Sequence, residues 1–89
     1  MKLVYFARVR VEIGLSEEVV EIPTDVKDIR ALIAWLAARG PAYARALADP
    51  ARLRAAIDQE IANLDAPLPP DAGEAPEIAF FPPMTGGGT

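Results

Sequence analysis

The stretch EIAFFPPMTGG, residues 77–87, combines a strand, a stiff corner and a flexible end. Its first five residues predict a short strand, and Pro82 and Pro83 end it, because proline has no amide hydrogen for a strand ladder. Phe80 and Phe81 are neighbours in that strand, so they point to opposite faces and only one can enter the core. The stretch therefore predicts a sheet whose last strand leaves through prolines into a slim glycine tip, whose backbone takes dihedral angles closed to other residues.

The composition of the 89 residues is that of one small globular domain. Hydrophobic residues make up 52% and charged residues 25%, which is too apolar for a disordered chain. We expect a domain over residues 1–83 and a flexible glycine tail over residues 84–89. The net charge of −4 disfavours nucleic acid and anionic membranes as partners. No apolar run suits a membrane span or a signal peptide, so a cytoplasmic location is expected.

The chain contains no cysteine and no histidine. Disulfides, thiolate metal sites and catalytic units that pair histidine with serine or cysteine are therefore excluded. The carboxylates Glu17, Glu18 and Glu21 lie close together, but we expect a solvated strand edge there rather than a metal or acid–base site. The sequence predicts no metal site and no bound cofactor, and any chemistry should depend on groups supplied by partners.

The first half of the chain predicts two strands and a helix. Residues 2–9 are rich in β-branched and aromatic side chains and predict a strand, which a turn at Gly14 joins to a second strand ending at Ile22. A helix should begin after Thr24 or Asp25 and end at Gly40. Its apolar face is formed by residues at helical spacing, namely Ile29, Leu32, Ile33 and Leu36. A short helix over residues 42–49 should follow and stop before Pro50.

Residues 53–64 are ambiguous when the residues alone are considered. Leu53, Ile57, Ile61 and Leu64 recur at helical spacing, yet Leu53, Ala55 and Ile57 also alternate as in a strand. Residue propensity favours the helix. The proline-rich segment that follows predicts a loop that leads to the last strand.

The order of these elements and the ending of the chain resemble the small subunit of molybdopterin synthase, a family of ubiquitin-like sulfur carriers. The most specific match is residues 77–87, and FARVR at residues 6–10 and AAIDQEIANLDAPL at residues 55–68 support it. The fold of this family is of the α+β class, a β-grasp in which a mixed sheet wraps around one main helix. The resemblance therefore implies two strands over residues 53–64, joined near Asp58 and Gln59, in place of the helix.

The resemblance also implies a function for the glycine tip. In this family a ubiquitin-activating-like adenylyltransferase uses ATP to adenylate the terminal glycine, and sulfur then replaces AMP to give a thiocarboxylate. By resemblance the terminal glycine is Gly87, preceded by Gly86, so Gly88 and Thr89 should first be removed. The thiocarboxylate enters the large subunit of molybdopterin synthase and donates its sulfur to a pyranopterin precursor of the molybdenum cofactor. The chain would then be a non-catalytic subunit, with the active site in its partner.

The same resemblance predicts a surface that binds partners. Phe6, Ile61 and Phe81 should form an apolar docking patch on the exposed face of the sheet, although isolated surface aromatics are common. Arg8 and Arg10 should lie on the same side as Phe6, where Arg10 could meet acidic groups of a partner and Arg8 is expected to be solvated. Pro82 and Pro83 complete the set of expected partner-binding residues by stiffening the path to the glycines.

Three other interpretations remain open. A sulfur carrier for thiamine synthesis and a ubiquitin-like modifier share the diglycine, although the segment FFPP at residues 80–83 favours the molybdopterin family. A glycine-rich end also occurs as a functionless terminus. A non-catalytic β-grasp scaffold with an inert tail is therefore the third interpretation, and the presence of Gly88 and Thr89 after the diglycine supports it.

Overall fold

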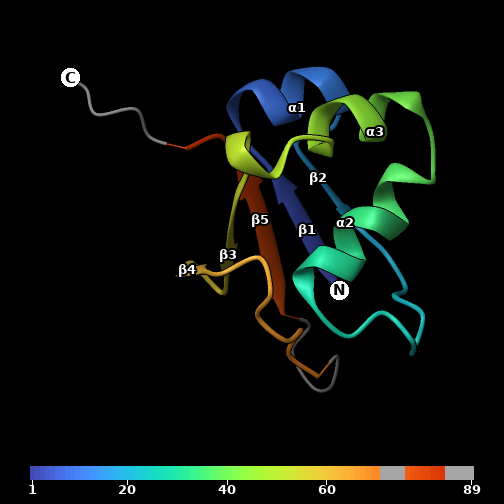
Figure 1. Cartoon of the computed structure of the whole chain (residues 1–89), viewed down its shortest axis with the longest axis vertical. Helices are drawn as coiled ribbons and strands as arrows, with labels where there is room; N and C mark the ends of the chain where they lie inside the picture. Colours follow the sequence, from blue (N-terminus) through green and yellow to red (C-terminus); the bar gives the residue numbers. More distant parts are fainter. Residues whose placement is uncertain (71–75, 84–89) are drawn as a thin grey trace.

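In the computed structural model, which describes residues 1–70 and 76–83, the chain forms a mixed sheet with helices on one side (Figure 1). The spatial order of the strands is β2-β1-β5-β3-β4. The central pair, β1 and β5, is parallel, and the other pairs are antiparallel. The strands are β1 (Lys2–Tyr5), β2 (Glu17–Val19), β3 (Arg54–Ile57), β4 (Glu60–Ala62) and β5 (Glu77–Phe81).

The helices cover one face and one end of this sheet. Figure 1 shows α2 (Ile29–Ala37) and α3 (Pro41–Leu47) beside the sheet, and α1 (Ala7–Ile13) across the end where β1 and β5 finish. A short 3₁₀ turn, η1 (Pro50–Arg52), leads from α3 into β3. None of the helices in the described part of the chain is long and apolar enough to cross a membrane.

The core lies between the sheet and the helices. Alternate residues of the two central strands, Leu3 and Tyr5 on β1 and Ile78 and Phe80 on β5, are almost fully buried, and the rings of Tyr5 and Phe80 stack with their centroids 6.3 Å apart. From the other side, α2 contributes the fully buried side chains Ile29, Leu32 and Leu36. The mixed sheet around one main helix confirms the expected β-grasp.

The predicted main helix is confirmed, but it begins later than expected. Neither Thr24 nor Asp25 caps it; the N-cap is Asp28, whose Oδ1 accepts a hydrogen bond from the amide of Ala31 at 2.7 Å. The short helix expected over residues 42–49 is also present, as α3, with Pro41 in its first turn, where its missing amide hydrogen costs no hydrogen bond.

Residues 53–64 form two strands, as the resemblance implied, so the helix favoured by propensity is wrong. The turn between β3 and β4 places Asp58 and Gln59 at positive φ, 49° and 72°. Asp58 is also tied to the start of β5, because its amide donates to the carbonyl of Glu77 at 2.8 Å and its Oδ1 accepts from the amide of Glu77 at 2.9 Å. Pairing with β5 therefore overrides the local preference for helix.

The strand predicted over residues 2–9 is wrong beyond Tyr5. The chain turns at Ala7, where φ is 52°, and continues as α1 to Gly14, whose φ of 89° and hydrogen bond to the carbonyl of Arg10 at 2.8 Å end the helix. Val9 is the fully buried residue of this helix. The alternating β-branched residues were a misleading signal, because helix α1 is stabilised by burial of Val9 rather than by propensity.

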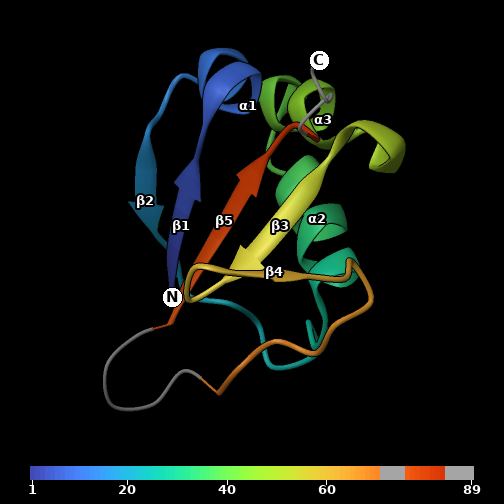
Figure 2. The same ribbon diagram turned by 90° about the vertical axis from the view of Figure 1, so that its left-hand side faces the viewer.

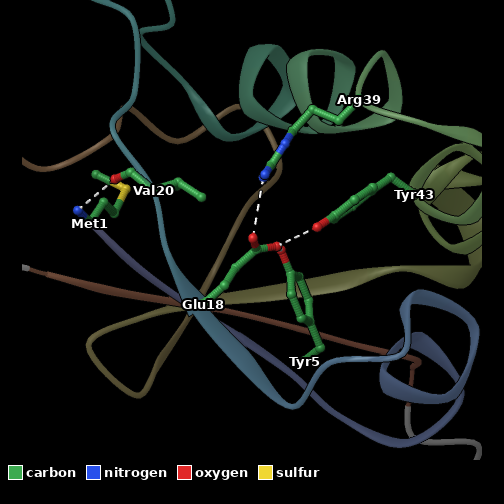
Figure 3. Close-up of polar contacts among 6 residues, drawn as sticks. All are labelled: Met1, Tyr5, Glu18, Val20, Arg39 and Tyr43. Carbon is green, nitrogen blue, oxygen red and sulfur yellow. Dashed lines mark hydrogen bonds and ion pairs between the residues drawn. The ribbon is translucent and has the colours of Figure 1, made fainter.

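The expected solvated edge at Glu17, Glu18 and Glu21 is wrong for Glu18. Figure 3 shows its carboxylate pointing from β2 toward side chains of β1, α3 and the end of α2. Glu18 Oε2 accepts hydrogen bonds from the hydroxyls of Tyr5, at 2.8 Å, and Tyr43, at 2.7 Å, and Oε1 accepts from Arg39 at 3.3 Å. Burial and the bond to Glu18 raise the pKa of Tyr5 far above its ordinary value, so this tyrosine stays neutral.

We expect Glu18→Ala to lower the free energy of unfolding by about 2 kcal/mol, because it leaves the buried Tyr5 hydroxyl without an acceptor. Urea denaturation followed by circular dichroism measures this change. Glu21→Ala is the matched control, since Glu21 is exposed, and it should cost less than about 0.5 kcal/mol. Equal effects of the two substitutions would contradict a stabilising role for the Glu18 carboxylate.

Candidate functional site

The face of the sheet opposite the helices carries an apolar surface, which Figure 2 views directly. Phe6 and Ile61 are exposed by 49% and 74%, and Phe81 is half-buried. We call this surface the outer patch and define it by the apolar residues that line its hollow, Val4, Phe6, Ala56, Ile61, Ala79 and Phe81. Phe6, Ile61 and Phe81 therefore line one hollow on this face, and their binding of a partner stays a prediction.

The outer patch is slightly concave. It lines a shallow hollow of about 440 Å³, at whose far end the Lys2 ammonium lies 3.0 Å from Glu17 and 4.0 Å from Glu77. The Glu17 carboxylate raises the pKa of Lys2 above its ordinary value, so the ion pair stays charged. The hollow is therefore apolar at its centre and charged at the end where β5 begins.

The root of the glycine tip lies at the other end of this hollow. Phe80 is fully buried and Phe81 lies on the outer face, as their neighbouring positions predicted. The amide of Phe6 donates to the carbonyl of Phe80 at 3.1 Å, which anchors the end of β5 to the start of α1. Pro82 and Pro83 follow, both half-buried, so the chain leaves the sheet from a fixed point beside the outer patch.

Arg8 and Arg10 do not alternate on the sheet face beside Phe6, because both lie on α1; that expectation is wrong. Arg8 is half-buried rather than solvated, and its guanidinium pairs with Glu12 one turn along the helix and with the carbonyl of Arg52 at 3.2 Å. Arg10 is exposed, and it forms no ion pair within the described residues. Its helix begins directly after Phe6, whose amide donates to the carbonyl of Phe80 at 3.1 Å.

The glycine tip itself is outside the described part of the chain. Gly86, Gly87, Gly88 and Thr89 all follow Pro83, where the description ends. The structure therefore shows the surface from which the tip departs. The expected roles of these four residues remain predictions from the sequence.

No three carboxylates gather closely enough to hold a metal ion within residues 1–70 and 76–83. A larger hollow of about 610 Å³ lies beside β4 and η1. Of its three charged residues, Arg30 and Asp65 pair with each other at 2.7 Å, and the Arg54 guanidinium donates to the carbonyl of Leu53 at 2.9 Å. We place no reaction in this hollow.

Two features of the site were missed from the sequence, and a sequence signal is present for the first of them. Arg8 and Glu12 are four residues apart and Gly14 follows, a spacing typical of a helix with a glycine end. Arg54 lies opposite Phe81 in the pairing of β3 with β5, which places a cation beside the root of the tip. That neighbour became visible only with the register of the sheet.

Two sequence comparisons find proteins that are similar to this chain. The profile of the ThiS family matches residues 3–87. The molybdopterin synthase sulfur carrier subunit of Escherichia coli (strain K12) is 37% identical over 87 residues, which cover 98% of this chain and 99% of that protein.

Two solved structures share the fold. SAMP1 from Haloferax volcanii superposes with a TM-score of 0.69 at 20% identity, over 98% of each chain. A proposed molybdopterin converting factor, subunit 1, from Pyrococcus furiosus gives a TM-score of 0.62 at 22% identity, over 93% of this chain and 95% of that one. At these identities the structures support the fold alone. The family match includes all of the sheet except Lys2, and it includes the diglycine, so the chain belongs to the ThiS family.

Proposed function

We propose that this protein is the sulfur carrier subunit of a molybdopterin synthase. The observation that carries the proposal is the 37% identity, over nearly the full length of both chains, to a sulfur carrier subunit of that enzyme. The family match ends at Gly87, which agrees with the diglycine as the functional end. The outer patch beside the exit of β5 supports the proposal, because it offers an apolar surface to a partner that takes up the tip.

The chemistry belongs to the carboxyl group of Gly87. A carboxylate is a poor electrophile, so an activating enzyme first joins one of its oxygens to the α-phosphorus of ATP and releases pyrophosphate. A sulfur nucleophile then displaces AMP from the acyl carbon and leaves a thiocarboxylate. In the large subunit this sulfur bonds to a carbon of the pyranopterin precursor and displaces an oxygen leaving group from it. Water then cleaves the acyl carbon–sulfur bond of the resulting thioester, which leaves the sulfur on the precursor and returns the carboxylate to Gly87. The proposal places these steps in the cytoplasm, where ATP is available.

The side chains of the carrier have only to position the tip in this scheme. Gly86 and Gly87 lack a Cβ and let the backbone pass close to the walls of a partner's channel. Pro82 and Pro83 hold the start of the tip, so the ordering entropy lost on insertion falls on few residues. Phe6, Ile61 and Phe81 would bind the large subunit, and Arg10 would contact its acidic groups.

Complementation tests the proposal. A strain of Escherichia coli that lacks its own sulfur carrier subunit should regain molybdenum-enzyme activity when it expresses residues 1–87 together with the large subunit and the activating enzyme from the same genome as this chain. A strain that lacks its thiamine sulfur carrier is the control. Rescue of thiamine synthesis alone would assign the chain to the rival pathway, and rescue of neither strain would favour the scaffold.

A further inference from the structure

Four arginines lie on the elements that adjoin the end of β5. They come from three separate elements, and we call them the basic collar: Arg8, Arg10, Arg52 and Arg54. Arg8 and Arg10 lie on α1, Arg52 ends η1, and Arg54 begins β3. The chain as a whole carries a net charge of −4, so this positive cluster is opposite in sign to the overall charge.

A side-chain hydrogen bond and the pairing of two strands hold these elements together beside the end of β5. The Arg8 guanidinium donates to the carbonyl of Arg52 at 3.2 Å, which joins α1 to η1. Arg54 lies directly opposite Phe81 in the antiparallel pairing of β3 with β5. The amide of Arg10 donates to the carbonyl of Phe6 at 3.3 Å, so the backbone of Arg10 adjoins a residue of the outer patch.

Most of the charge of the collar is available to a partner. Arg10, Arg52 and Arg54 are exposed, and within the described residues none of the three forms an ion pair. Two carboxylates lie on the same elements: Glu12 pairs with Arg8, and Asp49 accepts a hydrogen bond from the amide of Ala51 at 3.0 Å. Four arginines against two carboxylates leave this end of the sheet positive.

The opposite end of the same face is negative. Glu77 begins β5, Asp58 lies in the turn bonded to it, and Glu60 begins β4, while Lys2 is the basic residue paired there. β5 runs from this end toward α1 (Figure 2). The outer patch therefore lies between the acidic start and the basic exit of this strand. A partner that covers the patch therefore meets two opposite charges at a fixed spacing, which sets its orientation.

We propose that the basic collar binds an acidic rim around the opening of the large subunit into which the glycine tip inserts. The inference rests on the proposed function and adds the charge of the partner's surface to it. Attraction between the collar and such a rim would orient the carrier before the apolar contact forms and would raise the association rate. A protein is favoured over nucleic acid because the collar is continuous with the apolar patch and the rest of the chain is acidic.

The test compares Arg54→Glu with Lys27→Glu, since each changes the net charge by the same amount. Lys27 is exposed and lies just before the N-cap of α2. The start of α2 lies at the end of the molecule opposite α1 (Figure 1). Association of the carrier with the large subunit from the same genome is followed by stopped-flow fluorescence at several salt concentrations. We expect Arg54→Glu to slow association about 10-fold at low salt, and Lys27→Glu to slow it less than about 2-fold. The difference should disappear in high salt.

Equal slowing by both substitutions would overturn the collar, because only the net charge would then matter. Unchanged or faster association of Arg54→Glu would also overturn it, and would leave the proposed function intact as long as the unmodified carrier still binds. Failure of the unmodified carrier to bind the large subunit would overturn both proposals. Binding of a fluorescent single-stranded RNA that Arg54→Glu abolishes would identify a nucleic-acid surface instead and contradict the inference.

Discussion

The chain that ends at Gly87 should become a thiocarboxylate at least about 100-fold faster than the chain that continues to Thr89. Two further residues carry the reactive carboxylate past the position where the activating enzyme aligns it with ATP. The terminal residue is then also a β-branched threonine, stiff at χ1, in place of a glycine. The family match ends at Gly87, in agreement with this expectation.

The rates are measured by incubating both chains with the activating enzyme, ATP and a sulfur source, and following the mass increase for exchange of one oxygen by sulfur. A chain that ends in Gly87→Ala is the control, and it should fold normally but react more slowly than the chain that ends in glycine. If the longer chain is modified at Thr89 as fast as the shorter one at Gly87, no removal of Gly88 and Thr89 is needed. The account of the glycine tip would then be wrong.

Phe81→Asp should weaken binding of the large subunit by about 3 kcal/mol, roughly 100-fold in Kd. Phe81 belongs to the outer patch and directly precedes Pro82, where the chain leaves the sheet, and a carboxylate there would be buried in an apolar interface. Isothermal titration calorimetry gives the change in affinity. Circular dichroism should show an intact fold, because Phe80 and not Phe81 fills the core.

Val19→Asp is the matched control for this experiment. Val19 is an apolar residue, 77% exposed on the edge strand β2, and it does not line the hollow of the outer patch. It should therefore leave the affinity almost unchanged. If the two substitutions weaken binding equally, the loss reflects added negative charge rather than the apolar contact, and the outer patch is not the interface.

The elements that could be predicted from the sequence are those whose pattern and position in the fold agree. The face of α2 follows from the spacing of Ile29, Leu32 and Leu36, and the inward Phe80 and outward Phe81 follow from the alternation of a strand. Helix α1 and strands β3 and β4 could not be predicted from propensity, because tertiary contacts decide both. Val9 of α1 is buried in the core, and Asp58 is hydrogen-bonded to Glu77 on the neighbouring strand β5.

The candidate site divides in the same way. The prolines, the diglycine and the outer aromatic residue are local features, so the sequence predicts them directly. Glu18 and Arg54 each lie beside a residue that is distant in the sequence. Glu18 accepts a hydrogen bond from Tyr43 on α3, and Arg54 lies opposite Phe81 in the sheet. Neither neighbour can be inferred before the order and register of the strands are known.

The central claim is that the carboxyl group of Gly87 carries sulfur, and the intact mass of the protein purified from its own host tests this most directly. The account predicts a chain that ends at Gly87, with a fraction heavier by the exchange of one oxygen for sulfur. Treatment that hydrolyses thiocarboxylates should return this fraction to the lighter mass. A chain that retains Gly88 and Thr89 and carries no sulfur, in cells that are making molybdenum cofactor, would contradict the account.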